Sequence, residues 1–398
     1  MEVGIEGLSI AFPEVYLDLA ELAVARGVAP GKYLDGIGTR RMAVALPEED
    51  TVTFAARAAR EVLERTGTAP DQIGLLAVGT ETAVDHSKPV ASFVQGLVGI
   101  GPRCRVFETK HACYGGTAAL QLSLDWIRSG NARGKKALVV CADIARYGIG
   151  TPGEPTQGAG AVALLLSDRP ELLAIEAGTA GIAAVDVHDF WRPLYSKDAM
   201  VDGHYSVQCY LDAVSGAYQH HKELVNAPPG LYSDHFAALA YHVPYGKMAK
   251  KAHRQLRSLD GDVDPDASFE RLVAAGLMMP AEIGNIYTGS LYLALASLLE
   301  NTKAPLAGRP IGLFSYGSGS CAEFYTGVVG PKAQQWVRDL GLPARLAARR
   351  SLSIAEYEEI MRAREDLDRR PVGGAPGRDF SFLGVDGHRR TYRGPAQA

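Results

Sequence analysis

A cysteine in the stretch KHACYGGTAAL, residues 110–120, has the surroundings expected of a nucleophile. Apolar residues 106–107 precede it as a strand would, and helically spaced apolar residues follow, which places Cys113 at a strand-to-helix turn. The positive end of a helix dipole lowers the pKa of a nearby thiol from its free value of about 8.5. Backbone N–H groups at Gly115 and Gly116 would be available to hold an oxyanion. An inert buried thiol remains the alternative, because cysteine is often a core residue.

Two other reactive residues also follow predicted strands. Glu81 comes just after the apolar run 73–78, and His242 comes directly after 237–241. In open α/β sheets, ligands bind beyond the carboxyl ends of the strands, so side chains at these positions can share one pocket. We therefore expect Glu81, Cys113 and His242 to converge. Taken singly, Glu81 also fits a solvated loop carboxylate, and His242 also fits a structural histidine.

A stripe of basic residues begins just after His242. Lys247, Lys250, Lys251 and Arg254 are spaced i, i+3, i+4 and i+7, so a helix would carry them on one face. Next to a thiolate, such a stripe suits the phosphates of an acyl carrier, whereas without that context it would be a solvated charged face. Two glycine-rich stretches lack the third glycine of a dinucleotide-binding loop; they are 158–161 and 317–320.

The elements that must position these residues alternate between strand and helix. Apolar runs predict strands at 3–12, 73–78, 137–142 and 158–166, and helical periodicity predicts helices at 17–26, 50–67, 92–98 and 115–129. The second half repeats the theme, with strands at 172–175, 237–241 and 311–316 and helices at 247–259 and 291–299. This alternation predicts an α/β protein with a mostly parallel sheet. After residue 330 we expect a peripheral tail with a helix at 353–364, a linker at 371–377 and a loosely ordered end.

Composition narrows the class of protein. The 398 residues are 47% hydrophobic, enough for a substantial core, and the net charge of −4 gives no reason to expect nucleic acid as a partner. The five cysteines are scattered without a C-x-x-C pair, so neither disulfides nor a metal site is predicted. Neither a signal peptide nor an apolar run of about 18 residues is evident, which predicts a cytoplasmic protein without membrane contact.

Seven motifs, in this order, resemble those of 3-hydroxy-3-methylglutaryl-CoA (HMG-CoA) synthases. They are GTE at 79–81, the cysteine turn, GEPTQGAG at 153–160, HDFWRP at 188–193, HVPYGKM at 242–248, GNIYTGS at 284–290 and FSYGSG at 314–319. The resemblance implies a thiolase-type α/β fold, in which two similar halves form five α-β-α-β-α layers, and usually a homodimer. We accordingly expect one half at 1–168, the other at 169–330 and the tail at 331–398.

The resemblance also implies residue roles. By motif, Cys113 would carry an acetyl group, Glu81 would be the general acid and base, and His242 would position the acceptor thioester. The positions that would line or support the pocket are Tyr114, Asp143, Asp189, Asn285 and Ser318. Lys247 and Lys250 would contact the substrate phosphates. The implied reaction condenses acetyl-CoA with acetoacetyl-CoA and needs neither a metal nor a redox cofactor.

The family has two branches, and the sequence carries features of both. DFWRP at 189–193 and the lysines of the basic stripe resemble the enzymes that make a mevalonate precursor from CoA thioesters. The segments 104–108 and 113–121, the Lys88-Pro89 step and 252–254 resemble the polyketide branch, which adds an acetyl-derived carbon to chains on acyl carrier proteins. A non-catalytic binding protein of the same fold is a third hypothesis, which the presence of Cys113, Glu81 and His242 disfavours.

Overall fold

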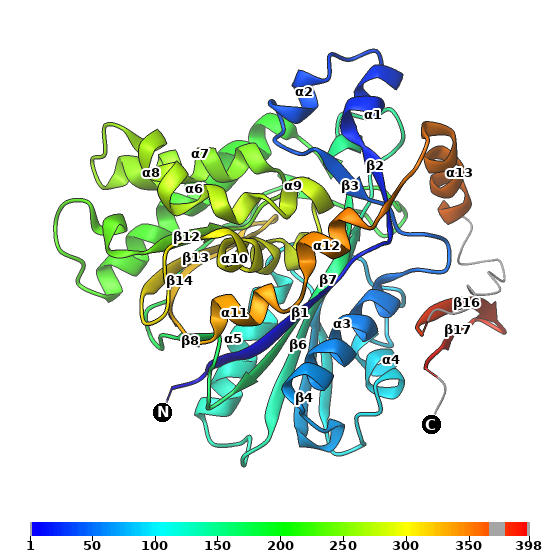
Figure 1. Ribbon diagram of the computed structural model, residues 1–398, viewed down its shortest axis with the longest axis horizontal. Coiled ribbons are helices and arrows are strands. Elements are labelled where there is room, and N and C mark those ends of the chain that lie inside the picture. Colours follow the sequence, from blue (N-terminus) through cyan, green and yellow to red (C-terminus); the bar gives the residue numbers. More distant parts are fainter. Residues whose placement is uncertain (1, 366–378, 396–398) are drawn as a thin grey trace.

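The computed structural model describes residues 2–365 and 379–395, and its centre is one ten-stranded mixed sheet (Figure 1). The strand order is β12-β13-β14-β8-β1-β7-β6-β4-β5, with β9 paired to β14. The strands are β1 Gly4–Ala11, β4 Ile73–Gly79, β5 Arg105–Thr109, β6 Lys136–Ala145, β7 Gly158–Ser167, β8 Leu173–Ile175, β9 Gly181–Ala184, β12 Ala238–Tyr241, β13 Pro310–Gly317 and β14 Cys321–Val329. The short antiparallel pairing of β1 with β8 joins the strands of the two halves.

The prediction of a mostly parallel sheet is wrong. Only β4 with β5, β4 with β6, and β12 with β13 pair in parallel; the other pairs of this sheet are antiparallel. A continuous apolar run indicates that a strand is buried on both faces but says nothing about its direction. The sequence analysis also missed β14, which returns from β13 through residues 318–320.

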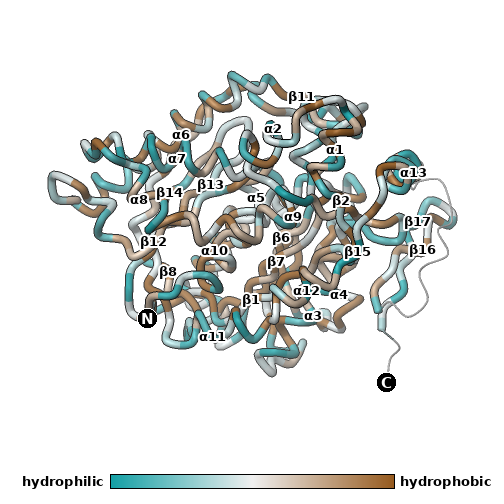
Figure 2. Tube along the Cα trace, turned by 45° about the horizontal axis from the view of Figure 1, so that its top comes forward, coloured by the Kyte–Doolittle hydropathy of each residue, from teal (hydrophilic) through white to brown (hydrophobic). Residues whose placement is uncertain are grey.

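Helices cover the sheet in layers, in agreement with the predicted five-layer α/β fold. In the first half, α3 (Thr51–Thr66) packs on β1, β6 and β7, while α5 (Gly115–Arg128) packs on β4 and β6. In the second half, α10 (Ser290–Asn301) packs on β12 and β13, and α6 (Gly203–Leu224) packs on β9 and β14. The helix α7 (Gly246–Leu259) packs on α6. The hydroxyls of Thr117 on α5 and Tyr292 on α10 are 2.8 Å apart, so these two helices meet in the middle layer. Figure 2 shows the hydrophobic colouring concentrated along central strands such as β1, β6 and β7.

Each predicted helix is present, as α1, α3, α4, α5, α7, α10 and α13, whereas the 22-residue α6 and the shorter α2, α8, α9, α11 and α12 were not predicted. Asp50 caps the start of α3, and Gly67 ends it in the left-handed region at φ 63°, as the sequence pattern indicates. The helices are α1 Leu19–Ala25, α2 Gly31–Leu34, α3 Thr51–Thr66, α4 Val90–Leu97, α5 Gly115–Arg128, α6 Gly203–Leu224, α7 Gly246–Leu259, α8 Pro265–Leu272, α9 Pro280–Ile283, α10 Ser290–Asn301, α11 Ala333–Arg338, α12 Leu342–Ala347 and α13 Ile354–Glu365.

The chain after residue 330 is more than a helical tail. β15 Arg350–Ser351 pairs with β2 Val15–Asp18, which also pairs with β3 Arg41–Ala43. Farther on, β16 Ser381–Asp386 and β17 Arg389–Arg393 form a hairpin whose Phe382 is fully buried. The predicted linker at 371–377 lies outside the described residues. The remaining short pair, β10 Phe190–Trp191 with β11 Met200–Val201, brackets the segment that closes one side of the functional site.

Candidate active site

Cys113 and Glu81 meet as predicted. The Cys113 thiol donates a hydrogen bond of 3.0 Å to Oε1 of Glu81. Two glycines allow the approach, because a Cβ on Gly79 at the end of β4 would lie 2.5 Å from the backbone of Gly116 at the start of α5. The turn between β5 and α5 is held by the Tyr114 N–H, which donates to a backbone carbonyl three residues earlier at 3.0 Å. A strand end and a helix start therefore bring the two reactive groups together.

Asp143 organises the turn that carries Glu81. Its Oδ1 accepts hydrogen bonds from the Thr80 hydroxyl at 2.8 Å, the Glu81 N–H at 2.9 Å, and the Thr82 N–H and hydroxyl at 3.0 and 2.7 Å. Its Oδ2 accepts from the N–H and hydroxyl of Thr288, at 3.0 and 2.5 Å. Since Thr288 belongs to the second half of the chain, one buried carboxylate fixes the Glu81 turn and docks the two halves at the site.

Burial controls the protonation of the reactive pair. Desolvation, reinforced by the charge of Asp143, raises the pKa of Glu81 to about 8. Desolvation and the adjacent Glu81 raise the pKa of Cys113 well above its usual value. The expectation that a helix N-terminus would lower this thiol pKa is therefore wrong for the free protein. The thiol needs an adjacent base, and Glu81 is in position to accept its proton.

His242 follows β12 directly, in the second half of the chain. Its N–H donates to the Phe314 carbonyl at 2.7 Å, and its own carbonyl accepts from the Tyr210 hydroxyl at 2.7 Å. Burial lowers the pKa of His242 to about 3, so the imidazole is neutral at physiological pH. Three residues beyond Phe314, β13 ends at Gly317, where a Cβ would lie 2.5 Å from the Tyr114 nitrogen. The turn after β13 thus contacts the cysteine turn.

The predicted supporting residues take distinct places around this centre. Asp189 accepts hydrogen bonds from the Tyr316 hydroxyl at 2.6 Å and the Gly319 N–H at 2.9 Å, which holds the turn that contains Ser318. Asn285 Oδ1 accepts from the Tyr287 N–H and the Ser290 hydroxyl, both at 2.8 Å. This interaction shapes the segment that also supplies Thr288 to Asp143. Asp143, Asp189 and Asn285 therefore act on the site by ordering its loops.

Tyr114 leads to a carboxylate that the sequence analysis missed. Its hydroxyl donates to Oε2 of Glu323 at 2.8 Å, and the Gln121 amide also donates to Glu323. Burial raises the pKa of Glu323 to about 7. The available sequence signal was a single carboxylate within the otherwise apolar strand β14, AEFYTGVV from 322 to 329. Glu323 anchors the residue that follows Cys113.

The basic stripe of α7 is only partly available for a ligand. Arg254 pairs with both carboxylate oxygens of Asp266, at 2.9 and 2.8 Å, and Lys250 lies 3.4 Å from the same carboxylate. Lys247 donates to the Asp35 carbonyl at 3.4 Å, beside the first turn of α7. The structure therefore separates the predicted phosphate ligands: Lys250 already has a counter-charge, whereas Lys247 contacts only a backbone oxygen through its ammonium group among the described residues.

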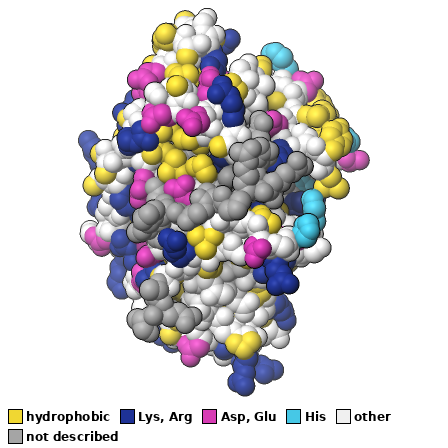
Figure 3. All heavy atoms as spheres, turned by 90° about the vertical axis from the view of Figure 1, so that its right-hand side faces the viewer, with side chains coloured by type: hydrophobic (Ala, Val, Ile, Leu, Met, Phe, Trp, Pro, Cys, Tyr) yellow, Lys and Arg dark blue, Asp and Glu magenta, His cyan; other side chains and the backbone are white. Residues whose placement is uncertain are grey.

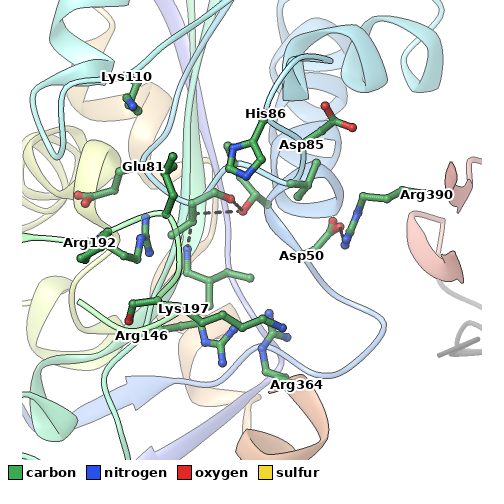
Figure 4. A pocket seen from close by; sticks show the side chains of 18 residues that line it. Asp50, Glu81, Asp85, His86, Lys110, Arg146, Arg192, Lys197, Arg364 and Arg390 are labelled. Atoms are coloured by element: carbon green, nitrogen blue, oxygen red, sulfur yellow. Dashed lines mark hydrogen bonds and ion pairs between the residues drawn. The ribbon is translucent and has the colours of Figure 1, made fainter. Parts of the chain in front are cut away.

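Glu81 is also one of the residues that line a cavity of about 420 Å³ (Figure 4). Its wall includes Thr82 and Ile144, and its basic side chains are Lys110, Arg146, Arg192, Lys197, Arg364 and Arg390. Sequence reasoning quoted Arg192 within a motif but gave it no role. Over residues 2–365 and 379–395, no group of acidic, histidine and cysteine side chains could hold a metal ion, and no helix is long and apolar enough to cross a membrane.

Comparison with known proteins identifies the family. The N-terminal model of hydroxymethylglutaryl-coenzyme A synthase matches residues 1–170, and the C-terminal model matches 173–268 and 265–371. The hydroxymethylglutaryl-CoA synthase of Enterococcus faecalis is 43% identical over 371 residues, which cover 92% of this chain and 94% of the relative. The chain therefore belongs to the HMG-CoA synthase family and is a transferase-type enzyme.

Solved structures agree with this assignment and confirm the thiolase-type fold. MvaS in complex with 3-hydroxy-3-methylglutaryl coenzyme A matches with a TM-score of 0.94 at 48% identity, covering 99% of each chain. The HMG synthase of the curacin biosynthetic pathway, in complex with its holo donor acyl carrier protein (ACP), matches with a TM-score of 0.92 at 35% identity, covering 99% of this chain and 100% of that one. Both branches of the family are thus structural neighbours.

Proposed function

We propose that this enzyme condenses the acetyl group of acetyl-CoA with acetoacetyl-CoA through an acetyl-Cys113 intermediate and releases a 3-hydroxy-3-methylglutaryl thioester. The observation that carries the proposal is the 3.0 Å hydrogen bond between the Cys113 thiol and Glu81. It joins a nucleophile to a group whose pKa of about 8 lets it both accept and return a proton near neutral pH.

In the first step, Glu81 accepts the thiol proton and the Cys113 sulfur attacks the acetyl carbonyl carbon. The carbon–sulfur bond to CoA breaks, and the CoA thiolate takes the proton from Glu81. Splitting the transfer through a covalent intermediate replaces one difficult step with two easier ones. Glu81 ends this step as a carboxylate, ready for the next proton transfer.

In the second step, Glu81 removes a proton from the methyl group of acetyl-Cys113, and the resulting carbanion attacks the 3-ketone of the acceptor. The developing alkoxide takes the proton back from Glu81. His242, neutral because its pKa is about 3, can position the acceptor thioester with hydrogen bonds without adding a charge. Water then hydrolyses the thioester on Cys113. The chain's own side chains supply each proton transfer, so we propose no metal or redox cofactor.

We propose CoA as the acyl carrier. The supporting observations are the higher identities to a CoA-type relative and to MvaS, 43% and 48%, against 35% for the curacin HMG synthase. Lys247, at the first turn of α7, is the basic residue best placed for a CoA phosphate, because Lys250 is paired with Asp266. Such an enzyme would supply a mevalonate precursor. The alternative is β-branching in polyketide biosynthesis, with acyl groups delivered on ACP.

We further propose a homodimer in a reducing, cytoplasmic compartment. β5 lies at the end of the sheet, and a second copy could continue the sheet across this edge. All five cysteines are free thiols, and the proposed chemistry requires Cys113 to stay reduced. Sedimentation equilibrium would show about twice the chain mass of 42.4 kDa for a dimer, and the chain mass alone would contradict it.

The decisive experiment is intact mass spectrometry of the enzyme mixed with acetyl-CoA or, separately, with acetyl-loaded carrier protein. We expect an acetyl adduct from acetyl-CoA that disappears in Cys113→Ala. The conservative variant Cys209→Ala, which changes another buried cysteine, should still be acetylated. Loading only from the carrier protein would assign the enzyme to the polyketide branch. Acetylation that persists in Cys113→Ala would overturn the proposed nucleophile.

A further inference from the structure

Positively charged side chains predominate in the cavity beside Glu81 but not on the surrounding surface. Six basic side chains line it, against the carboxylates of Asp50, Glu81 and Asp85. On the face that carries the C-terminal hairpin, Lys and Arg side chains alternate with Asp and Glu (Figure 3). The excess of cations is therefore a local property of the cavity, and it favours an anion inside it.

Two arginines in the cavity wall, Arg146 and Arg364, have unused hydrogen-bonding capacity. Arg364, only 7% exposed, donates from one nitrogen to the carbonyls of Ala45, Leu46 and Glu49. The Nε atoms of Arg364 and Arg146 are buried without a hydrogen-bond partner within the described chain. Burial and the nearby positive charge of Arg146 lower the pKa of Arg364 to about 10. Bringing an anion into the cavity would relieve this repulsion.

Arg192 connects this basic wall to the reactive centre. In Figure 4 its side chain lies beside Glu81, and both residues line the cavity. Its positive charge opposes the rise in the pKa of Glu81 that burial causes. Glu81 in turn contacts Cys113. Glu81 therefore links Cys113 to the cavity that Arg192 lines.

The last step of the proposed reaction needs a route by which water can enter and a site that can bind an anion. Hydrolysis of the enzyme thioester requires water while the other end of the product is still attached to its carrier. Neither Lys247 nor any other residue of α7 lines the cavity, so a carrier bound along α7 would leave it open. Hydrolysis also converts a neutral thioester into a carboxylate beside Glu81, where a cation is needed to offset the repulsion.

We propose that this cavity is the water entrance for thioester hydrolysis and that Arg192 binds the carboxylate which hydrolysis creates. The inference rests on the proposed function. A water molecule gives one proton to Glu81 while its oxygen bonds to the thioester carbon. The carbon–sulfur bond then breaks, and the Cys113 sulfur takes that proton from Glu81. The new carboxylic acid releases its own proton to solvent and pairs with the guanidinium as a charge-assisted hydrogen bond. Arg192 acts as a binding residue for the nascent product.

The test follows each covalent state of the enzyme by rapid-quench intact mass spectrometry. Wild type, Arg192→Gln and Arg192→Lys are first acetylated and then mixed with acetoacetyl-CoA. Arg309→Gln is the matched control, because it removes one exposed arginine just before β13, at the opposite end of that strand from residues 317–320. Circular dichroism and thermal unfolding verify that the variants are folded.

We expect Arg192→Gln to be acetylated within about twofold of the wild-type rate but to hydrolyse the hydroxymethylglutaryl-enzyme at least about tenfold more slowly, as expected for losing a hydrogen bond to a charged group. That adduct should accumulate, Arg192→Lys should restore part of the rate, and Arg309→Gln should match wild type. Lys197→Gln, also in the cavity, should show a smaller delay in the same step.

Two results would overturn the inference: hydrolysis within twofold of wild type in Arg192→Gln, or an equal slowing of acetylation and hydrolysis, which would indicate general damage to the site. Failure of the proposed function itself looks different, because wild-type Cys113 would then never acquire an acetyl group.

Discussion

Two cation-rich regions of this enzyme differ in what surrounds the charge. The basic stripe of α7, made of Lys247, Lys250, Lys251 and Arg254, is exposed or partly exposed, and Arg254 and Lys250 share the carboxylate of Asp266. In the cavity beside Glu81, burial and then the nearby charge of Arg146 lower the pKa of the Arg364 guanidinium to about 10. Exposed pairs are screened by water and contribute little, whereas buried charges act strongly on one another. Position therefore decides which cations influence the chemistry.

Glu81→Gln should produce the largest effect, because Glu81 is the desolvated reactive group that lines the cavity. We expect carbon–carbon bond formation to fall by at least about 10³-fold, within the range of general acid–base catalysis. Acetylation should slow less than condensation, because removing the carboxylate lowers the pKa of Cys113, which burial and Glu81 both raise, and this partly offsets the loss of the base. Quenched-flow mass spectrometry separates the two steps. Normal product formation by the variant would refute the role of Glu81.

The same substitution should change stability in a pH-dependent way. The folded protein keeps Glu81 protonated up to a pH of about 8, whereas the unfolded chain releases this proton near 4.5. The wild type therefore loses stability as pH rises through that window, by at most about 1.4 kcal/mol per unit of displaced pKa. From pH 5 to pH 8, the free energy of unfolding of Glu81→Gln should therefore rise relative to that of the wild type. A constant difference would show that Glu81 does not titrate there.

Asp143→Asn should have the next largest effect and tests whether one buried anion organises the site. An amide cannot accept all the hydrogen bonds that Thr80, Thr82 and Thr288 now donate, so we expect a loss of about 3 kcal/mol in urea unfolding. In the pH profile of any remaining activity, the basic limb should move to lower pH, because the charge of Asp143 helps to raise the pKa of Glu81. Asp125→Asn, which alters an exposed carboxylate, should change stability by less than about 0.5 kcal/mol.

The α7 stripe should show the smallest effects. Lys247→Ala should raise the KM for acetyl-CoA by about fivefold or less, the strength of one exposed ion pair, and the increase should shrink at high salt. Lys250→Ala should change KM less, since its ammonium group lies 3.4 Å from Asp266. A double-mutant cycle of Lys250 with Asp266 should give a coupling below about 1 kcal/mol. A larger effect of Lys250 than of Lys247 would reverse this ranking.

Sequence reasoning succeeded for the reactive pair and failed for strand direction. Glu81 and Cys113 follow neighbouring parallel strands, β4 and β5, so their meeting at one edge could be predicted. The antiparallel directions of β7 and β14 could not be predicted, because an apolar strand has the same composition in either direction. α6 was missed because its 22 residues mix tyrosine, histidine and charged residues with few of the aliphatic residues that define a helical face.

The sequence by itself determined the chemical groups and their local settings: a thiol before a helix, a carboxylate and an imidazole after strands, and glycines where the backbones approach. Only the tertiary structure decided their protonation and the positions of their partners. The pKa of Cys113 rises because the fold desolvates the thiol and places Glu81, 32 residues earlier, 3.0 Å away. Arg364, near the other end of the chain, joins the same cavity as Glu81. Electrostatic energy depends on distance and burial, and neither quantity is a property of residue order.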